Sequence, residues 1–532
     1  MKTPAEVSAY AERLLGTHHS DVPRAARQRI RPCDMPPPRA CPSLFLHSAT
    51  PTLRAFDIEL AALLAGGRAH DIPTYVEARS VSLGTADDLS VGRTAPWAEA
   101  VAHWGVPSVD IGDRDHYYLS QALLAMAGAH EQGAATPLRD VIEWLRDHPQ
   151  AVVRLYALDL EMQVFLLWLQ RQCGLSRLLT DANAPVIAAR WNRKRPLHPT
   201  VTAARSIPVE GTSAVGLLAA EQRLSEAHRR LGLRIPVLPG YTVPREGVSR
   251  EVFVAQVLEA AEMLRHRYDL STAVLKPSAA GDGIGVVGGL DLTDTERLTA
   301  EAEAAHALED DYLLEAWVDY LPVRLGETTT PLAVSGHFHF GQLVDGLTLQ
   351  VLKGYSWQGN ISLDEPSWRA LGLPADSYRR IREALIALRE AFRGPASLRE
   401  GSYRGLSAGG IDFAVGRIGG RFGDTVLTAA IDLNLSAHGA AGLHAFQRTA
   451  RSEGAVHRFA ATRVLCPTAD QTLTRMAATA RSMPPPGGRM GALACVPRHW
   501  GMIAATGHDP AAAARHVAEL LDAITTQDVP AT

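Results

Sequence analysis

Residues 272–289 read TAVLKPSAAGDGIGVVGG: an apolar strand delivers Lys276 and then runs into a turn rich in glycine. The glycines allow backbone N–H groups to converge, and a neighbouring ammonium offsets negative charge, so the stretch is suited to hold a polyphosphate. The lysine precedes the glycines, so the spacing is neither a P-loop nor a dinucleotide fingerprint. A hairpin turn beside a surface lysine is the open alternative.

A second apolar strand, residues 312–318 (YLLEAWV), carries a single carboxylate at Glu315. Burying a carboxylate costs free energy unless a partner compensates its charge. One use for it is to accept a hydrogen bond from the amino group of an adenine ring, while the next backbone groups contact the ring edge. The other interpretation puts Glu315 at a strand end, ion-paired or solvated.

Two further apolar strands end in acidic side chains: residues 409–415 (GGIDFAV) hold Asp412, and residues 425–434 (TVLTAAIDLN) hold Asp432 and Asn434. Side chains alternate between the faces of a strand, so Asp432 and Asn434 share a face. A short turn joins the strands, and pairing them as a hairpin would bring Asp412 close to Asp432. Two carboxylates and an amide suit Mg²⁺, which also takes waters and substrate phosphates as ligands. Acids that simply face water at strand ends are the alternative.

The composition is that of a globular protein of several domains. The 532 residues are 46% hydrophobic and 21% charged, and a net charge of -4 gives no basic excess for nucleic acid. Five scattered cysteines show neither zinc-ligand spacing nor a disulfide framework. The N-terminus lacks the apolar region of a secretory signal, and the most apolar stretch, residues 162–169, is far shorter than the ~20 residues that span a bilayer. We therefore expect a cytoplasmic protein without nucleic-acid or membrane partners.

Strands and helices alternate along the chain, which predicts an α/β or α+β fold. The apolar run 44–49 predicts a buried strand that opens an α/β unit, and residues 52–65 have helical spacing. Residues 152–169 are apolar on nearly every side, which predicts a helix enclosed within a domain. Residues 1–42, dense in proline towards their end, are interpreted as an N-terminal arm.

In order along the chain, the segments RIPVLPGYTV, VLKPSAAGDGIGV, YLLEAWV, GGIDFAV and AAIDLN resemble the ATP-grasp superfamily of carboxylate–amine and carboxylate–thiol ligases. The resemblance covers residues 190–442. The long region before it and the tail after it are similar to the layout of pheganomycin-type peptide ligases. The implied domains are an arm (1–42), a pre-ATP-grasp α/β domain (43–189), an ATP-grasp domain (190–445, with the phosphate lid and adenine strand in 272–318) and a small C-terminal domain (446–532).

The resemblance also implies a ligand for each motif residue. Those expected to bind ATP are the phosphate-binding Lys276, the lid residues Ser278, Gly281, Gly283 and Gly285, and, for adenine, Glu315, Trp317 and Val318. Those expected to hold Mg²⁺ are Asp412, Asp432 and Asn434. Lys194, in the tract WNRKR, sits where such enzymes often place an earlier phosphate-binding lysine, although a basic tract usually faces solvent. Arg404 is the candidate catalytic residue, holding a substrate carboxylate.

The chain departs from the superfamily pattern at three positions. Many relatives have glutamate in place of Asp432 and arginine in place of Ser436, and several dipeptide-forming relatives have arginine in place of Gly410. A missing arginine removes a bidentate donor for phosphate or an oxyanion. Arg404, Arg417, Arg421 or His438 are the groups that could compensate.

The implied reaction is ATP-dependent amide formation through an acyl phosphate, on amino-acid or peptide substrates in natural-product biosynthesis. The departures leave two alternatives open: a nucleotide-binding module without catalysis, and an ATP-dependent carboxylase that activates bicarbonate. Related ligases often dimerise, so a homodimer is possible.

Overall fold

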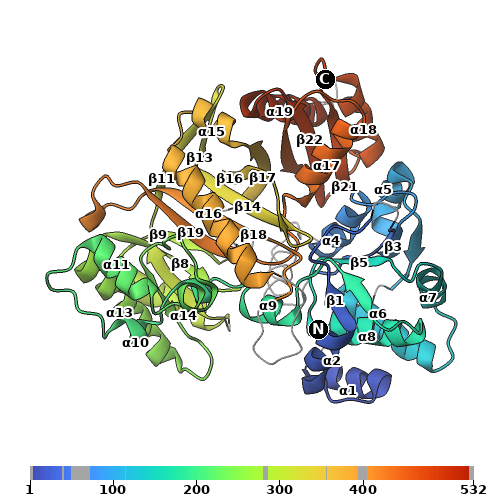
Figure 1. The fold of residues 1–532 in the computed structure, drawn as a ribbon, viewed down its shortest axis with the longest axis horizontal. Coiled ribbons are helices and arrows are strands. Elements are labelled where there is room, and N and C mark those ends of the chain that lie inside the picture. The colour runs from blue at the N-terminus through green and yellow to red at the C-terminus, as the bar shows by residue number, and fades with distance from the viewer. Residues whose placement is uncertain are drawn as a thin grey trace.

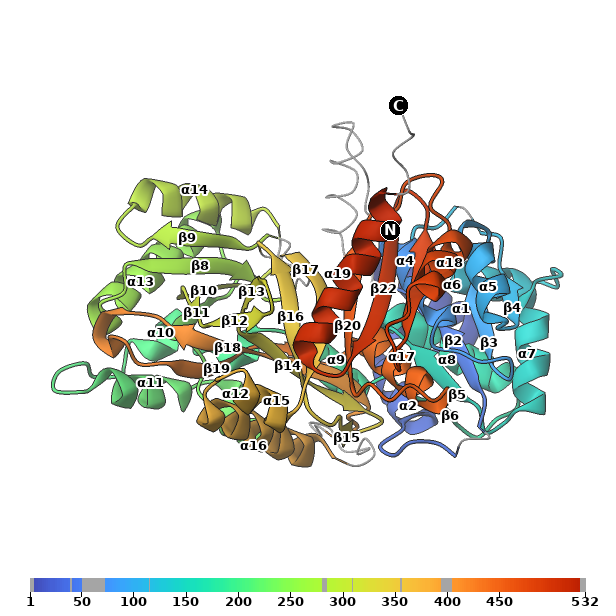
Figure 2. The same ribbon diagram turned by 90° about the horizontal axis from the view of Figure 1, so that it is seen from above.

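The computed structural model describes residues 4–38, 41–49, 72–113, 115–279, 285–308, 310–354, 356–393 and 404–526. The helix expected at residues 52–65 lies outside them. Figures 1 and 2 show a four-stranded layer at one end of the molecule, a parallel layer at the other, and a large antiparallel sheet between them. The α/β class that the sequence predicted is confirmed.

The first layer is a six-stranded parallel sheet in the order β1-β6-β5-β2-β3-β4. Its strands are β1 Ile30–Pro32, β2 Ser43–Leu46, β3 Leu89–Gly92, β4 Ser108–Asp110, β5 Val152–Leu155 and β6 Leu178–Thr180. Its main helices are α1 Pro4–Leu15, α2 Val22–Arg29, α4 Ile72–Val81, α5 Ala98–Trp104, α6 Leu119–Glu131, α7 Leu138–Asp147 and α8 Leu160–Gln172. A core that includes Phe165 and Trp168 of α8 fills the space between sheet and helices.

Two expectations for this layer are wrong. The segment 1–42 is not an arm where it is described, because β1 pairs with β6 and α1 packs on α6 and α8. Residues 152–169 are not one helix: β5 is a central strand, and α8 starts only at Leu160, where Asp159 caps it through the N–H of Met162. A strand buried on both faces is as uniformly apolar as an enclosed helix, so periodicity does not separate them.

The second layer is a four-stranded antiparallel sheet, β7-β10-β8-β9. The strands are β7 Gly240–Val243, β8 Thr272–Pro277, β9 Val287–Asp291 and β10 Tyr312–Ala316, and the helices packed here are α10 Val201–Ala204, α11 Ala214–Gln222, α13 Arg250–Tyr268 and α14 Thr295–His306. In this sheet β10 lies between β7 and β8, so Glu315 faces Gly240 on one side and Val274 on the other. The strand that carries Glu315 is therefore central.

The third layer is a ten-stranded sheet with the path β11-β18-β14-β16-β17-β20-β22-β21, to which β15 and β19 are attached. Its strands are β11 Asp319–Tyr320, β14 Ala333–His339, β15 Gln342–Leu343, β16 Leu347–Lys353, β17 Ser356–Leu363, β18 Ala408–Arg417, β19 Leu427–Asn434, β20 Phe459–Leu465, β21 Met490–Val496 and β22 Trp500–Gly507. A small ribbon pairs β12 Pro322–Leu325 with β13 Thr328–Pro331. The main helices of this part are α15 Glu365–Ala370, α16 Ala375–Phe392, α17 Ala441–Ser452, α18 Leu473–Ser482 and α19 Pro510–Thr526.

The C-terminal segment does not form a sheet of its own. Strand β20 pairs with β17, at Ile361 opposite Ala461, and β22 and β21 extend the same sheet. One apolar core runs from Leu385 of α16 to Leu520 of α19. Residues 446–532, where described, are thus continuous with the middle of the chain. None of the described helices is long and apolar enough to cross a membrane.

The junction between β17 and β20 depends on a glycine at 359. Its φ is +146°, and a Cβ added there would overlap the carbonyl oxygen of Thr462. We expect Gly359→Ala to lower the free energy of unfolding by about 3–5 kcal/mol, because it combines a strained backbone with a clash against main chain. Denaturant unfolding of the full chain measures it.

Gly372→Ala is the matched control. Gly372 also has a positive φ, +69°, but open space surrounds its added Cβ. The Gly372→Ala substitution should lower the free energy of unfolding by about 1 kcal/mol. Equal losses in the two variants would show that the β17–β20 junction is not tightly packed.

Candidate active site

Strands β18 and β19 bring together the three residues expected to hold a cation. Asp412 and Asp432 are directly opposite each other in the ladder. The Asn434 side chain lies beside them, with its amide Nδ2 donating to Asp412 Oδ2 at 2.6 Å. Ser335 of the neighbouring strand β14 donates to the other oxygen, Oδ1, at 2.5 Å. The expected hairpin and the expected convergence are both present.

This arrangement shifts the ionisation of one aspartate. Burial, together with the charge of Asp432, raises the pKa of Asp412 to about 6, although the hydrogen bond from Ser335 acts in the opposite direction. Gln350 Nε2 donates to Ser335 Oγ at 2.6 Å and so orients this donor. The pair carries excess negative charge that a bound cation would neutralise.

One cation already faces the pair: Lys194 Nζ lies 2.8 Å from Asp432 Oδ2. Lys194 is only 9% exposed, so the alternative interpretation, in which the basic tract faces solvent, is wrong for this lysine. Its backbone is fastened to the end of β8, because Lys194 N donates to Ser278 O at 2.9 Å and Arg195 N to Ser278 Oγ at 3.0 Å. Ser278 therefore positions Lys194 against Asp432.

Lys276 and Glu315 form a buried ion pair with His198. The Lys276 ammonium donates to Glu315 Oε1 at 2.7 Å, and His198 Nε2 lies 2.8 Å from Oε2. Burial would raise the pKa of Glu315, but Lys276 and His198 outweigh it and hold the pKa below its ordinary value. Glu315 is buried and not solvated; it is ion-paired, as one form of the alternative interpretation had it, and it is the last residue but one of β10.

Lys276 also connects the two antiparallel sheets, because its ammonium donates to Ile431 O, next to Asp432, at 3.3 Å. Lys276 was expected to contact phosphate, and Glu315 was expected to contact adenine. In the structure Lys276 and Glu315 form an ion pair with each other, and Lys194 is the lysine whose ammonium contacts Asp432 of β19. The two lysines thus approach the aspartate pair from different elements.

The other predicted residues differ in their placement. Val318 is buried just beyond β10. Trp317 is half-buried, and its backbone N–H donates to the carbonyl oxygen of Thr272 at 3.3 Å. Gly285 has a φ of +68°. Gly281 and Gly283 lie outside the described residues. Arg404 is exposed and precedes β18.

The donors present fit a hard divalent cation. Across the described ranges no group of three or more His, Cys, Asp or Glu could hold a metal ion, so a site built from such side chains alone is not found. Two aspartates and an amide are a smaller set, which suits Mg²⁺ when water and phosphate complete its coordination.

Sequence reasoning missed His198, Ser335 and Gln350, which orient the charged groups. A serine or glutamine inside a strand gives no local sign of its partner. A usable signal for the lysines was overlooked: the chain has only four, at positions 2, 194, 276 and 353, although it is rich in arginine. Two of the four are buried beside the predicted ligands.

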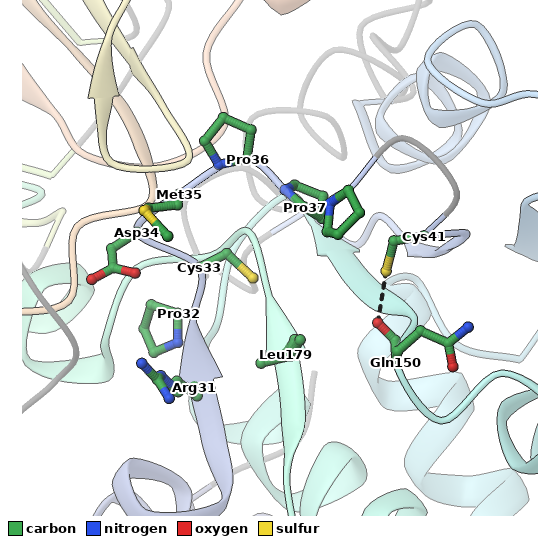
Figure 3. A pocket seen from close by; sticks show the side chains of 11 residues that line it. Arg31, Pro32, Cys33, Asp34, Met35, Pro36, Pro37, Cys41, Gln150 and Leu179 are labelled. Atoms are coloured by element: carbon green, nitrogen blue, oxygen red, sulfur yellow. Dashed lines mark hydrogen bonds between the residues drawn. The ribbon is translucent and has the colours of Figure 1, made fainter.

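A cavity of about 420 Å³ lies elsewhere, against the segment that follows β1 (Figure 3). Cys33, Met35, Cys41 and Leu179 are among its lining residues. Burial, with the charge of Asp181, raises the pKa of the Cys33 thiol to about 11, so this thiol is protonated at neutral pH. The cavity therefore presents no activated nucleophile at Cys33.

No family model and no curated protein matches the chain. Among solved structures, it is similar to N5-carboxyaminoimidazole ribonucleotide synthetase in its ADP complex (TM-score 0.45, 12% identity, covering 85% of this chain and 95% of that one). It is also similar to carboxyaminoimidazole ribonucleotide synthase from Aspergillus clavatus complexed with ATP (TM-score 0.42, 13% identity, covering 91% of this chain and 99% of that one). A third similar structure is D-cycloserine synthetase (TM-score 0.30, 17% identity, covering 56% of this chain and 82% of that one). These values do not establish a family or an activity for the chain.

The pKa of Asp412 predicts how cation binding depends on pH. A carboxylate with a pKa of about 6 is mostly ionised at pH 7 and mostly protonated at pH 5. Since the cation needs the ionised form, its affinity should fall about tenfold between these values. The affinity for Mn²⁺ is measured as a function of pH in the presence of ATP. The Asp412→Asn variant, which lacks the titrating carboxylate, shows how much of the pH dependence comes from protonation of ATP itself. A slope no steeper in the wild type than in the variant would contradict the assignment.

The buried ion pair predicts a large loss of stability. Glu315→Ala leaves Lys276 and His198 buried without their carboxylate, which should lower the free energy of unfolding by about 3–5 kcal/mol. Glu365→Ala, which removes an exposed ion pair with Arg369 on α15, is the control and should cost less than about 1 kcal/mol. Similar unfolding curves for the two variants would contradict the buried network.

Proposed function

We propose that this protein is an ATP-dependent carboxylate–amine ligase of the ATP-grasp superfamily, which forms ADP. The single observation that carries the proposal is the pairing of Asp412 with Asp432, whose carboxylate lies 2.8 Å from the ammonium of Lys194. Two acids beside a fixed cation match what a magnesium–phosphate complex needs: ligands for the metal and a positive charge for the phosphate oxygens. The order of the sequence motifs supports the same conclusion.

The proposed reaction has two steps. An oxygen of the substrate carboxylate attacks the γ-phosphorus of ATP, and the bond to the bridging oxygen breaks, which releases ADP and leaves an acyl phosphate. An amine then attacks the acyl carbon, loses a proton, and expels inorganic phosphate to give the amide. Mg²⁺, when bound, neutralises charge that develops on the phosphate oxygens.

The chain's own residues take the following parts in this proposal. Asp412, Asp432 and Asn434 would hold Mg²⁺, and Lys194, which lies beside Asp432, would contact the phosphate oxygens. Lys276 is held by Glu315 next to Ile431 of β19, and it adds positive charge for the phosphates. The adenine edge would be contacted by Glu315 and by the backbone of Trp317 and Val318. The lid residues expected from the motif, Ser278, Gly281, Gly283 and Gly285, would keep water from the acyl phosphate; Gly281 and Gly283 lie outside the described residues.

The finer identity of the substrates is also part of the proposal. The likeness of the motifs to pheganomycin-type peptide ligases supports amino-acid or peptide substrates and a place in natural-product biosynthesis. Arg404 is the residue proposed to hold a substrate carboxylate. A cytoplasmic location and a homodimer accompany this proposal.

The test is phosphate release by the full chain with ATP, Mg²⁺ and pooled amino acids, with mass spectrometry of the products. Lys194→Met should lower phosphate release by about 100-fold or more, because it removes a charge that stabilises the transition state. Lys353→Met, at an exposed lysine on β16, is the control and should leave the rate unchanged.

The products distinguish the possible outcomes. A mass gain equal to the two substrates less water supports ligation. Phosphate release that depends on bicarbonate instead supports a carboxylase. Binding of ATP without turnover by any acid in the pool would support a non-catalytic nucleotide-binding module and overturn the proposal.

A further inference from the structure

The residues expected to hold the cation lie at the open end of the β18–β19 hairpin. The turn that joins the two strands is at the other end, between Arg417 and Leu427. The pair of Gly410 with Asn434 ends the ladder, and Asn434 is the last residue of β19. Strand ends open more readily than strand centres, because fewer bonds hold them. A contact beyond the ladder is therefore needed to fix Asn434 relative to Asp412.

Asn183, which follows β6, supplies such a contact. Its Nδ2 donates to the carbonyl oxygens of Ala408, at 2.7 Å, and of Leu435, at 2.5 Å. Its Oδ1 accepts from the backbone N–H groups of Ser407, at 2.7 Å, and of Ala408, at 3.0 Å. Ala408 is the first residue of β18, and Leu435 directly follows Asn434. One side-chain amide thus joins the start of one strand to the end of the other.

These four hydrogen bonds use the whole carboxamide of Asn183. An asparagine side chain has two N–H donors and an oxygen with two lone pairs, and each of them has a backbone partner here. The residue is only 3% exposed, so the bonds are shielded from water. An aspartate has the same size but no N–H group, and a leucine has neither donor nor acceptor. The backbone atoms around this position therefore select an asparagine.

The two strands approach each other closely at the same place. Gly409 has a φ of +152°, and a Cβ added to it would lie 2.9 Å from Leu435 Cα and 3.1 Å from Asn434 O. A glycine permits this approach because it has no side chain to clash. The approach brings two carbonyl oxygens from different strands within reach of one amide nitrogen.

The segment that carries Asn183 also carries the lysine of the site. It continues through α9 Pro185–Arg190 to Lys194, whose ammonium lies 2.8 Å from Asp432 Oδ2. Figures 1 and 2 show α9 between the parallel layer and the large sheet. Residues 183–194 are thus attached to the hairpin at both of their ends.

We infer that Asn183 is a positioning residue for the cation site: it holds the open end of the hairpin so that Asn434 stays beside Asp412. The inference rests on the proposed function for the binding of a cation and a nucleotide at this site. Asn183 acts through the backbone of Ala408 and Leu435, because these atoms and Ser407 N take up its polar groups. Removal of a residue that orients metal ligands typically lowers metal affinity about 10–100-fold.

The experiment measures, by calorimetry, the affinity of the full chain for a non-hydrolysable ATP analogue with Mn²⁺ and without metal. The ratio of the two affinities reports the contribution of the cation. Asn183→Ala should lower this ratio about tenfold or more, because Asn434 is no longer held beside Asp412. Circular dichroism checks that the variant folds.

Asn360→Ala is the matched control. Asn360 is also 3% exposed and lies on β17 of the same sheet, but its Nδ2 has no hydrogen-bond partner among the described residues. The ratio in this variant should equal that of the wild type. The comparison separates the hydrogen bonds of Asn183 from the general effect of removing a buried amide.

Hydrogen exchange gives a second readout, which needs neither metal nor nucleotide. In the wild type, the amides of Ser407 and Ala408 should exchange as slowly as those in the middle of β18, because both donate to Asn183. Asn183→Asp keeps the volume of the side chain and loses both N–H donors. It should accelerate exchange at residues 433–435 at least tenfold, which a loss of packing alone does not explain.

The outcomes separate this inference from the proposed function. A lower ratio in Asn183→Ala and not in Asn360→Ala would uphold the inference, whatever product the protein forms. An unchanged ratio in Asn183→Ala, an equal fall in both variants, or fast exchange of Ser407 and Ala408 in the wild type would overturn the inference and leave the ligase proposal standing. A wild-type affinity that does not depend on Mn²⁺ would overturn the cation site, and with it both proposals.

Discussion

Two aspartates directly opposite each other on paired strands are the constraint on which the site depends. Asp412 and Asp432 repel, and the raised pKa of Asp412 records the repulsion together with burial. The ammonium of Lys194, which lies 2.8 Å from Asp432, compensates part of this negative charge, and it belongs to a segment distant in sequence from both strands. We propose that the two acids would hold a divalent cation and that Lys194 would then contact phosphate.

The buried pair of Lys276 and Glu315 lies next to the same site, because Lys276 also donates a hydrogen bond to the second antiparallel sheet. Lys276 is on β8, yet it contacts the backbone of Ile431 on β19, one residue before Asp432. Loss of the pair would disturb both the four-stranded layer and the position of the aspartates. Stability and ligand binding are therefore linked through one ammonium group.

Local patterns predicted the elements that carry the site, and long-range contacts decided the rest. The strand at 272–277 and the hairpin of 409–415 with 425–434 follow from apolar alternation and a short connection, so they were predictable. The link between Lys194 and Ser278 was not, because it joins residues 84 positions apart in sequence. Strand β1 is only three residues long and includes a proline, so it resembled a linker and not part of a sheet.

We propose that Asp412, Asp432 and Asn434 would hold a divalent cation beside a nucleotide polyphosphate, near Lys194. A crystal structure with Mn²⁺ and a non-hydrolysable ATP analogue tests it most directly, because manganese is located by its anomalous scattering. We expect a manganese peak beside the two aspartates, with Lys194 turned to a phosphate oxygen. A manganese peak elsewhere, or a nucleotide bound away from β18 and β19, would contradict it.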